Sequence, residues 1–173
     1  RIMPHLMLPQ RNYHVVLQVD SFTQGGMENV VIDLALSLQT NGYRVAIVNF
    51  GKSGDASVKA KELGIQVISL PSDITDDSYR SWLLEAHVDV VNAHYSIRGA
   101  AACRGAEIPF VQTVHNSYVW FDPVQIEKYR EADRYTSIYL CVSMTAARYA
   151  DIVLGLDVCK MRVVPNGIDP SAI

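Results

Sequence analysis

The stretch Gly25-Gly26-Met27-Glu28 joins a short apolar segment to a long amphipathic one, and this junction decides the fold class. Residues 13–19 before it are compact and rich in valine, which predicts a strand. Apolar residues follow at positions 27, 30, 31, 34, 35 and 38, the spacing of one stripe along a helix. Paired glycines at such a turn let the backbone approach a bound group closely, and the free N–H groups at the helix start point toward that group. The junction therefore predicts an α/β domain that binds a phosphate or a polar substrate at this turn.

Length and composition restrict the class of protein. The chain has 173 residues, which suits one domain, and a domain of this size buries roughly 70% of the surface that its unfolded chain exposes. Its formal net charge is −3 and it has no run of Lys or Arg, which argues against a nucleic-acid partner. No apolar stretch reaches the ~18 residues of a membrane span. Peripheral contact with a membrane stays open.

The three cysteines, Cys103, Cys141 and Cys159, form no C-x-x-C pair and match no zinc module. Cys141 lies in an apolar run, which favours a buried and reduced thiol over a reactive one and so predicts a cytoplasmic protein. The first twelve residues show no signal-peptide pattern and predict an extended lead-in over residues 1–12. The expected domain then covers residues 13–170.

Strand-like and helix-like segments alternate along the chain. The expected strands are residues 13–19, 44–49, 65–70, 88–93, 109–114, 138–142 and 161–164. The expected helices are residues 27–38, 55–63, 79–86, about 96–104, 123–132 and 145–154. Because the strands are continuous apolar runs, they predict a parallel sheet with helices on both faces. Right-handed crossovers favour a Rossmann-like, doubly wound sheet in the order 3-2-1-4-5-6, with its switch point between the first and fourth strands.

Polar residues follow three strands that should be neighbours at the switch point, where open parallel sheets bind their ligands. Gly25 and Gly26 follow the first strand, His94 ends the fourth, and His115 and Asn116 follow the fifth. A single histidine at a strand end is usually structural. Two that converge on a glycine turn favour a functional role, most of all for His115.

Two charged residues near this edge each allow two interpretations. Glu28 lies in the first turn of the helix, where the helix dipole stabilises a carboxylate by ~0.3–1 kcal/mol; direct contact with a ligand is the alternative. Arg98 falls on the helix expected after His94 and either reaches an anionic group or forms a surface salt bridge. Ser143 is expected to cap the helix that follows it rather than to act as a nucleophile.

The loop after His115 carries three aromatic residues, Tyr118, Trp120 and Phe121. At the binding edge of the sheet, they would either form a surface that stacks on a sugar, docks an acceptor or touches lipid, or fill a small core beneath the loop. The common nucleotide motifs are absent: after Gly26 the next glycine is Gly42, so there is no G-x-G-x-x-G, and the sequence has no Walker lysine and no D-x-D pair.

Five motifs in order resemble the family-4 retaining glycosyltransferases of the GT-B fold. They are the G-G-x-E opening at residues 25–28 with its downstream L-A and G-x-x-V, the strand of residues 89–94 ending in His94, the T-x-H of residues 113–115, the V-S of residues 142–143, and the P-N-G-I-D of residues 165–169. Each motif is short, but together they cover the chain from Tyr13 to Pro170.

The resemblance implies one of the two Rossmann-like domains of a GT-B protein. In that family the N-terminal domain, which this chain resembles, mainly binds the acceptor, and a C-terminal domain that this chain lacks holds most of the nucleotide sugar. His115 would then lie near the transferring sugar as a catalytic residue, and the turn at Gly25 and Gly26 near the donor diphosphate and the acceptor. Further donor or acceptor contacts are expected at Glu28, His94, Arg98, Asn116, Tyr118, Trp120 and Asn166.

The expected function is transfer of a hexosyl group, with retention of configuration, from a nucleotide sugar to a glycan or lipid-linked acceptor. The resemblance implies no cofactor and no metal, the nucleotide sugar being a co-substrate, and a cytoplasmic enzyme with room for peripheral contact at the inner face of the membrane. This chain alone is expected not to transfer sugar. The alternatives are another GT-B enzyme, such as a sugar-nucleotide epimerase, and a non-catalytic glycan-binding relative.

Overall fold

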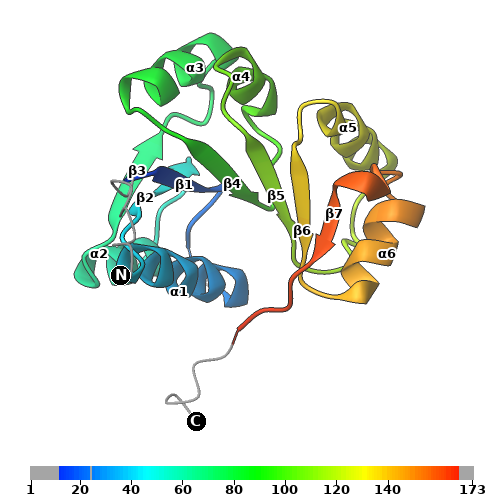
Figure 1. Ribbon diagram of the computed structural model, residues 1–173, viewed down its shortest axis with the longest axis horizontal. Coiled ribbons are helices and arrows are strands. Elements are labelled where there is room, and N and C mark those ends of the chain that lie inside the picture. Colours follow the sequence, from blue (N-terminus) through cyan, green and yellow to red (C-terminus); the bar gives the residue numbers. More distant parts are fainter. Residues whose placement is uncertain (1–11, 24, 168–173) are drawn as a thin grey trace, which may run out of the picture.

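The computed structural model describes residues 12–23 and 25–167. Within them, seven parallel strands form one sheet in the order β3-β2-β1-β4-β5-β6-β7 (Figure 1). The strands are β1 His14–Val19, β2 Arg44–Phe50, β3 Gln66–Leu70, β4 Val90–His94, β5 Phe110–Val114, β6 Ile138–Cys141 and β7 Met161–Val163. The expected doubly wound order is confirmed, and β7 adds to it beside β6. Residues 1–11 of the expected lead-in and residues 168–170 of the expected domain lie outside the described residues.

The helices mostly agree with the apolar periodicity. They are α1 Gly26–Thr40, α2 Asp55–Glu62, α3 Asp76–Glu85, α4 Ala100–Gly105, α5 Pro123–Asp133 and α6 Met144–Ile152, with a 3-10 turn at Val158–Lys160 that was not expected. As predicted, Ser143 caps α6, since its side chain accepts a hydrogen bond from the backbone N–H of Ala146. In the described part of the chain, no helix is both long enough and apolar enough to cross a membrane.

Two helix starts differ from the prediction. α3 begins before residue 79, because the Thr75 side chain accepts a hydrogen bond from the Ser78 N–H and caps the helix there. α4 begins at Ala100 and not near Ser96, because Gly99 has a φ of 69° and is left-handed. The prediction that a helix carries Arg98 is therefore wrong: Arg98 lies in the loop between β4 and α4.

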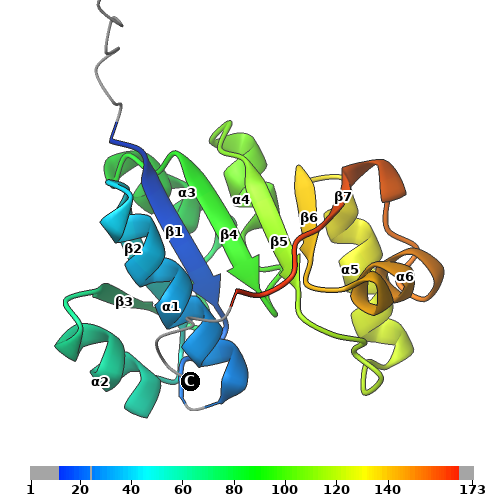
Figure 2. The ribbon, with the colours of Figure 1, turned by 60° about the horizontal axis from the view of Figure 1, so that its bottom comes forward.

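The helices pack against the sheet in three clusters. α1 and α2 bury their apolar residues with Leu17 and Ile47 on one face, and α3 and α4 bury theirs with Val16 and Val91 on the other (Figure 1). α5 and α6 share the third cluster with Tyr139 of β6. Figure 2 shows the segment after β7 running past β5 toward α1. On the face of the sheet that α1 covers, the surface above β4 to β6 therefore lies between α1 and this segment.

A buried polar network holds the loop after β4 against β1. The Tyr79 hydroxyl donates to Gln18 Oε1 at 2.8 Å. The Gln18 amide donates to Ser96 Oγ and to the Arg98 carbonyl, both at 2.8 Å, and Ser96 Oγ donates to an Asp20 carboxylate oxygen at 2.6 Å. These bonds position the carboxyl ends of β1 and β4, where the candidate site begins.

Candidate functional site

Two histidines from neighbouring strands meet at the carboxyl edge of the sheet. β4 and β5 pair in a register that places His94 beside Thr113, so His115 lies just beyond this pair. The Nδ1 atom of His94 is 2.8 Å from the Nε2 atom of His115. His94 is 1% exposed, whereas His115 is only partly buried.

Both imidazoles are neutral at pH 7. Burial, and to a smaller extent the neighbouring His115 ring, lowers the pKa of His94 from 6.5 to about 3. Burial lowers the pKa of His115 to about 4. The pair therefore shares one hydrogen bond between uncharged rings, and His115 can act on a ligand as a hydrogen-bonding group rather than as a cation.

Tyr95, which follows β4, extends this pair toward the surface. Its ring stacks on His115 with centroids 5.4 Å apart and planes within 6°. Its ring also stacks with Trp120 at 6.4 Å, and its hydroxyl accepts a hydrogen bond from the Asn116 amide at 2.8 Å. Because the Trp120 side chain is 58% exposed, a series of stacked rings leads from the histidines to a solvent-facing indole.

The aromatic loop divides into a buried part and an exposed part. Tyr118 is 1% exposed, and its ring contacts Phe121 and Tyr129 at centroid distances of 4.8 and 6.2 Å. Its hydroxyl accepts a hydrogen bond from the backbone N–H of His115 at 3.1 Å. Tyr118 and Phe121 thus belong to a core beneath the loop, while Trp120 remains at the surface.

The glycine turn opens α1 without a capping side chain. Gly25 is the N-cap, and no side chain accepts a hydrogen bond there. An added Cβ on Gly25 would lie 2.7 Å from the Glu28 carboxylate, whereas one on Gly26 would meet nothing within 4 Å. Glu28 is only 8% exposed. Tyr95 has a raised pKa mainly because it is buried, and the negative charge of Glu28 contributes to it.

Arg98 makes contacts away from the histidine pair. Its Nη1 donates to the Ser72 carbonyl at 2.6 Å, and its guanidinium carbon lies 5.1 Å above the centre of the Phe50 ring. Its Nε is 3.8 Å from an Asp20 carboxylate oxygen. Arg98 therefore joins the loops that follow β1 and β3 to the end of β2.

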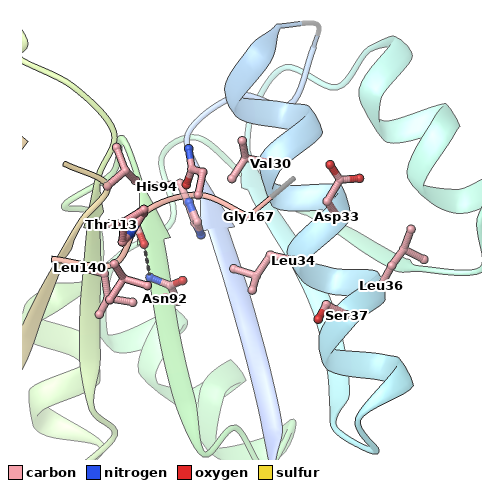
Figure 3. Close-up of a pocket in the computed structure, with 14 residues that line it drawn as sticks. Val30, Asp33, Leu34, Leu36, Ser37, Asn92, His94, Thr113, Leu140 and Gly167 are labelled. Carbon is pink, nitrogen blue, oxygen red and sulfur yellow. Dashed lines mark hydrogen bonds between the residues drawn. The ribbon is translucent and has the colours of Figure 1, made fainter. Parts of the chain in front are cut away.

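A cavity of about 930 Å³ adjoins His94 on the α1 side of the sheet (Figure 3). Apolar residues of α1, including Val30 and Leu34, form one wall, and the segment after β7, including Asn166, forms part of another. The polar residues at its base are His94, Asn92 and Thr113; the amide of Asn92 donates to Thr113 Oγ1 at 2.9 Å. Among the residues expected to contact a ligand, His94 and Asn166 line this cavity.

Asn92 and Thr113 were not among the residues predicted for the site. A signal for them was present, because each lies two residues before a predicted site histidine, and alternate residues of a strand point to the same face. Their positions thus place them on the same face as His94 and His115.

Residues 24–172 match the family model of Glycosyltransferase Family 4. The chain belongs to this family. Among solved structures, the chain is similar to a glycosyltransferase from Rickettsia africae, with 18% identity and a TM-score of 0.72 over 92% of this chain and 44% of that one. MurG from Acinetobacter baumannii matches with 16% identity and a TM-score of 0.60 over 77% of this chain and 42% of that one. The UDP-GlcNAc 2-epimerase from Methanocaldococcus jannaschii matches with 15% identity and a TM-score of 0.62 over 88% of this chain and 45% of that one.

At these identities, the structural matches establish the fold: the family-4 chain forms one Rossmann-like domain of the GT-B type, as the motifs indicated. The chain spans less than half the length of each of these solved structures. No curated protein matches it in sequence.

Proposed function

We propose that this family-4 chain is the N-terminal, acceptor-side domain of an enzyme that transfers a hexosyl group from a nucleotide sugar to a glycan or lipid-linked acceptor with retention of configuration. The observation that carries the proposal is the hydrogen-bonded pair of His94 and His115 at the carboxyl edge of the sheet. The pair supports the proposal because the glycine turn before α1 lies at the same carboxyl edge of the sheet, in a chain that belongs to family 4.

Transfer with retention requires stabilisation of a leaving nucleoside diphosphate and of a sugar that gains positive charge. At the uncapped start of α1, backbone N–H groups carry partial positive charge and can stabilise the diphosphate without a metal. His115 then provides an uncharged hydrogen-bonding group to the sugar or its phosphate. The second domain of the enzyme holds most of the nucleotide sugar, and no cofactor takes part.

The acceptor would lie on the outer part of the same edge. Trp120 offers an exposed ring against which a sugar can stack, and the exposed Asn116, whose amide donates to the Tyr95 hydroxyl, offers a polar group on the same loop. Since Trp120 stacks with Tyr95, which stacks on His115, a sugar on the indole would be held near the reacting group. The enzyme acts in the cytoplasm, and its exposed Val119 and Trp120 could also touch the membrane face that carries a lipid-linked acceptor.

A sugar-nucleotide epimerase is the second candidate, favoured by the structural matches to UDP-GlcNAc 2-epimerases. The test uses the longer protein that contains this chain, incubated with a panel of nucleotide sugars with and without glycan acceptors. A transferase forms a glycoside and releases nucleoside diphosphate in an acceptor-dependent manner. An epimerase converts the nucleotide sugar to its epimer without any acceptor, and that result would replace the proposed function.

Replacing Gly26 with valine in the longer protein should lower sugar transfer at least about 10-fold while changing the melting temperature little. Apart from its chain neighbours and the backbone of its own helix, a Cβ at this position meets nothing within 4 Å, so we expect little loss of packing and a clash mainly with a ligand bound at the turn. Steady-state kinetics alongside a melting curve measure both effects. Unchanged kinetics with a lowered melting point would make the glycine purely architectural.

His115→Ala should reduce turnover at least about 10-fold, equal to about 1.4 kcal/mol of transition-state stabilisation. The matched control is His87→Ala, since His87 is exposed at the end of α3 and away from this edge. Turnover per folded enzyme is measured for both variants. Equal losses at the two positions would remove His115 from the reaction.

The 173-residue chain alone should unfold cooperatively and bind nucleotide sugars more weakly than micromolar, because the donor is held mainly by the second domain. Calorimetric titration with common nucleotide sugars, and a circular dichroism melt of the same sample, provide the measurements. Micromolar binding of any of them would assign the donor to this domain.

A further inference from the structure

The bond between the two histidines requires one of them to be the donor. It joins Nδ1 of His94 to Nε2 of His115 at 2.8 Å, and each neutral imidazole carries a proton on only one of its nitrogens. The direction of the bond therefore determines which nitrogen of His115 is protonated.

The surroundings of His94 favour it as the donor. Its second nitrogen, Nε2, is buried and has no hydrogen-bond partner among the described residues. If His94 accepted the bond, this atom would be a buried N–H without an acceptor; if His94 donates, it is a bare lone pair. Orphaned buried N–H groups are rarer in folded proteins than unsatisfied acceptors, so donation by His94 is the less costly arrangement.

The remaining nitrogen of His115 is accessible to solvent. Nδ1 of His115 is not among the buried unpaired atoms, and it has no hydrogen-bond partner within residues 12–23 and 25–167. The His115 ring is held by the stacked Tyr95 ring and by its bond to His94, and the Tyr118 hydroxyl holds the backbone beneath it by accepting a hydrogen bond from the His115 N–H.

We propose that His94 is a positioning residue that holds His115 as the Nδ1–H tautomer, so that His115 presents a neutral N–H donor to an oxygen of the bound sugar or phosphate. The tautomer follows from the geometry of this chain, while the ligand rests on the proposed function. In this arrangement His115 has no free lone pair toward the ligand and cannot serve as a general base. It stabilises an oxygen that gains negative charge, and no proton is transferred.

The test is long-range ¹H–¹⁵N correlation of the histidine rings in the 173-residue chain at pH 7. The expected spectrum shows a protonated Nδ1 and an unprotonated Nε2 for His115, and a protonated Nδ1 for His94. The exposed His87 is the internal control and should show averaged nitrogen shifts from exchanging tautomers. A protonated Nε2 on His115, or averaged shifts like those of His87, would overturn the proposal.

Two variants separate positioning from packing. His94→Gln retains an N–H donor and should keep His115 as a single Nδ1–H tautomer, whereas His94→Leu removes the donor and should give averaged shifts. An unchanged tautomer in His94→Leu would overturn the role of His94. If that variant does not fold, the wild-type and His94→Gln spectra still decide the tautomer.

Kinetics of the longer protein then test the ligand contact separately. His94→Leu should lower turnover at least about 10-fold relative to the wild type. His94→Gln should retain most of the wild-type turnover. If the tautomer is confirmed but turnover is equal in the wild type and both variants, the Nδ1–H of His115 does not act on the ligand. The hydrogen-bonded histidine pair would then remain only as a feature of the fold. Absence of any sugar transfer by the wild-type protein would count against the proposed function instead.

Discussion

Gly99→Ala is expected to lower the free energy of unfolding by about 3 kcal/mol, the largest effect of any single substitution considered for this chain. Gly99 has a φ of 69°, and an added Cβ would lie 2.3 Å from a carbon of the Tyr79 ring. That ring cannot move away easily. It is 1% exposed, its hydroxyl bonds to Gln18, and it packs edge-on to Phe50 and stacks on Trp82.

Gly64→Ala is the matched control for Gly99→Ala. Gly64 also has a positive φ, 79°, but an added Cβ there meets nothing within 4 Å. Its substitution should therefore cost only the backbone strain, about 1 kcal/mol. Urea unfolding of the two variants measures the difference. Equal losses would show that the Tyr79 ring can yield and that close packing at Gly99 contributes nothing.

The domain should lose about 4 kcal/mol of stability between pH 7 and pH 5, from His94 and His115 together. Both side chains have an ordinary pKa of 6.5 when unfolded, lowered by burial to about 3 and about 4 in the fold. Between these values the unfolded chain takes up protons that the native state does not. The contribution of the two histidines to the free energy of unfolding is therefore fully present above pH 6.5 and decreases as the pH falls toward 4. At pH 5 the loss is about 2 kcal/mol for each histidine.

Urea unfolding at pH 7 and pH 5 measures this loss, and His94→Leu is its control. Without the buried imidazole, the variant should lose about 2 kcal/mol less over the same pH interval than the wild type does. His14 adds to the loss in both proteins, since burial lowers its pKa as well. A pH-independent stability would contradict the neutral, buried state of the pair.

Local pattern was enough to predict the architecture. Continuous apolar runs at residues 45–48 and 138–142 predict buried parallel strands, and the glycine turn at residues 25–28 marks the junction of strand and helix. Crossover handedness then leaves few sheet orders, and the observed one is among them. The same reasoning placed the ends of β1, β4 and β5 at one edge, and so placed His94 and His115 together.

The start of α4 departed from the prediction because a contact distant in sequence overrides the local pattern. Gly99 has a left-handed backbone and lies against Tyr79, so α4 cannot begin before it. Arg98 therefore lies in a loop, where it donates to the Ser72 carbonyl. Neither contact partner is near Gly99 or Arg98 in the sequence, and helical periodicity carries no information about them.

The sequence by itself determined the fold class, the order of the strands and the edge that carries the polar residues. Those properties depend on the repeat of apolar side chains over a few neighbouring residues and on general rules of chain connection. Tertiary structure alone decided that His94 and His115 share a hydrogen bond, that Tyr118 is buried while Trp120 is exposed, and that Asn92 and Thr113 form the base of a cavity. Each of these depends on distances between side chains of different elements, which packing sets and no local repeat encodes.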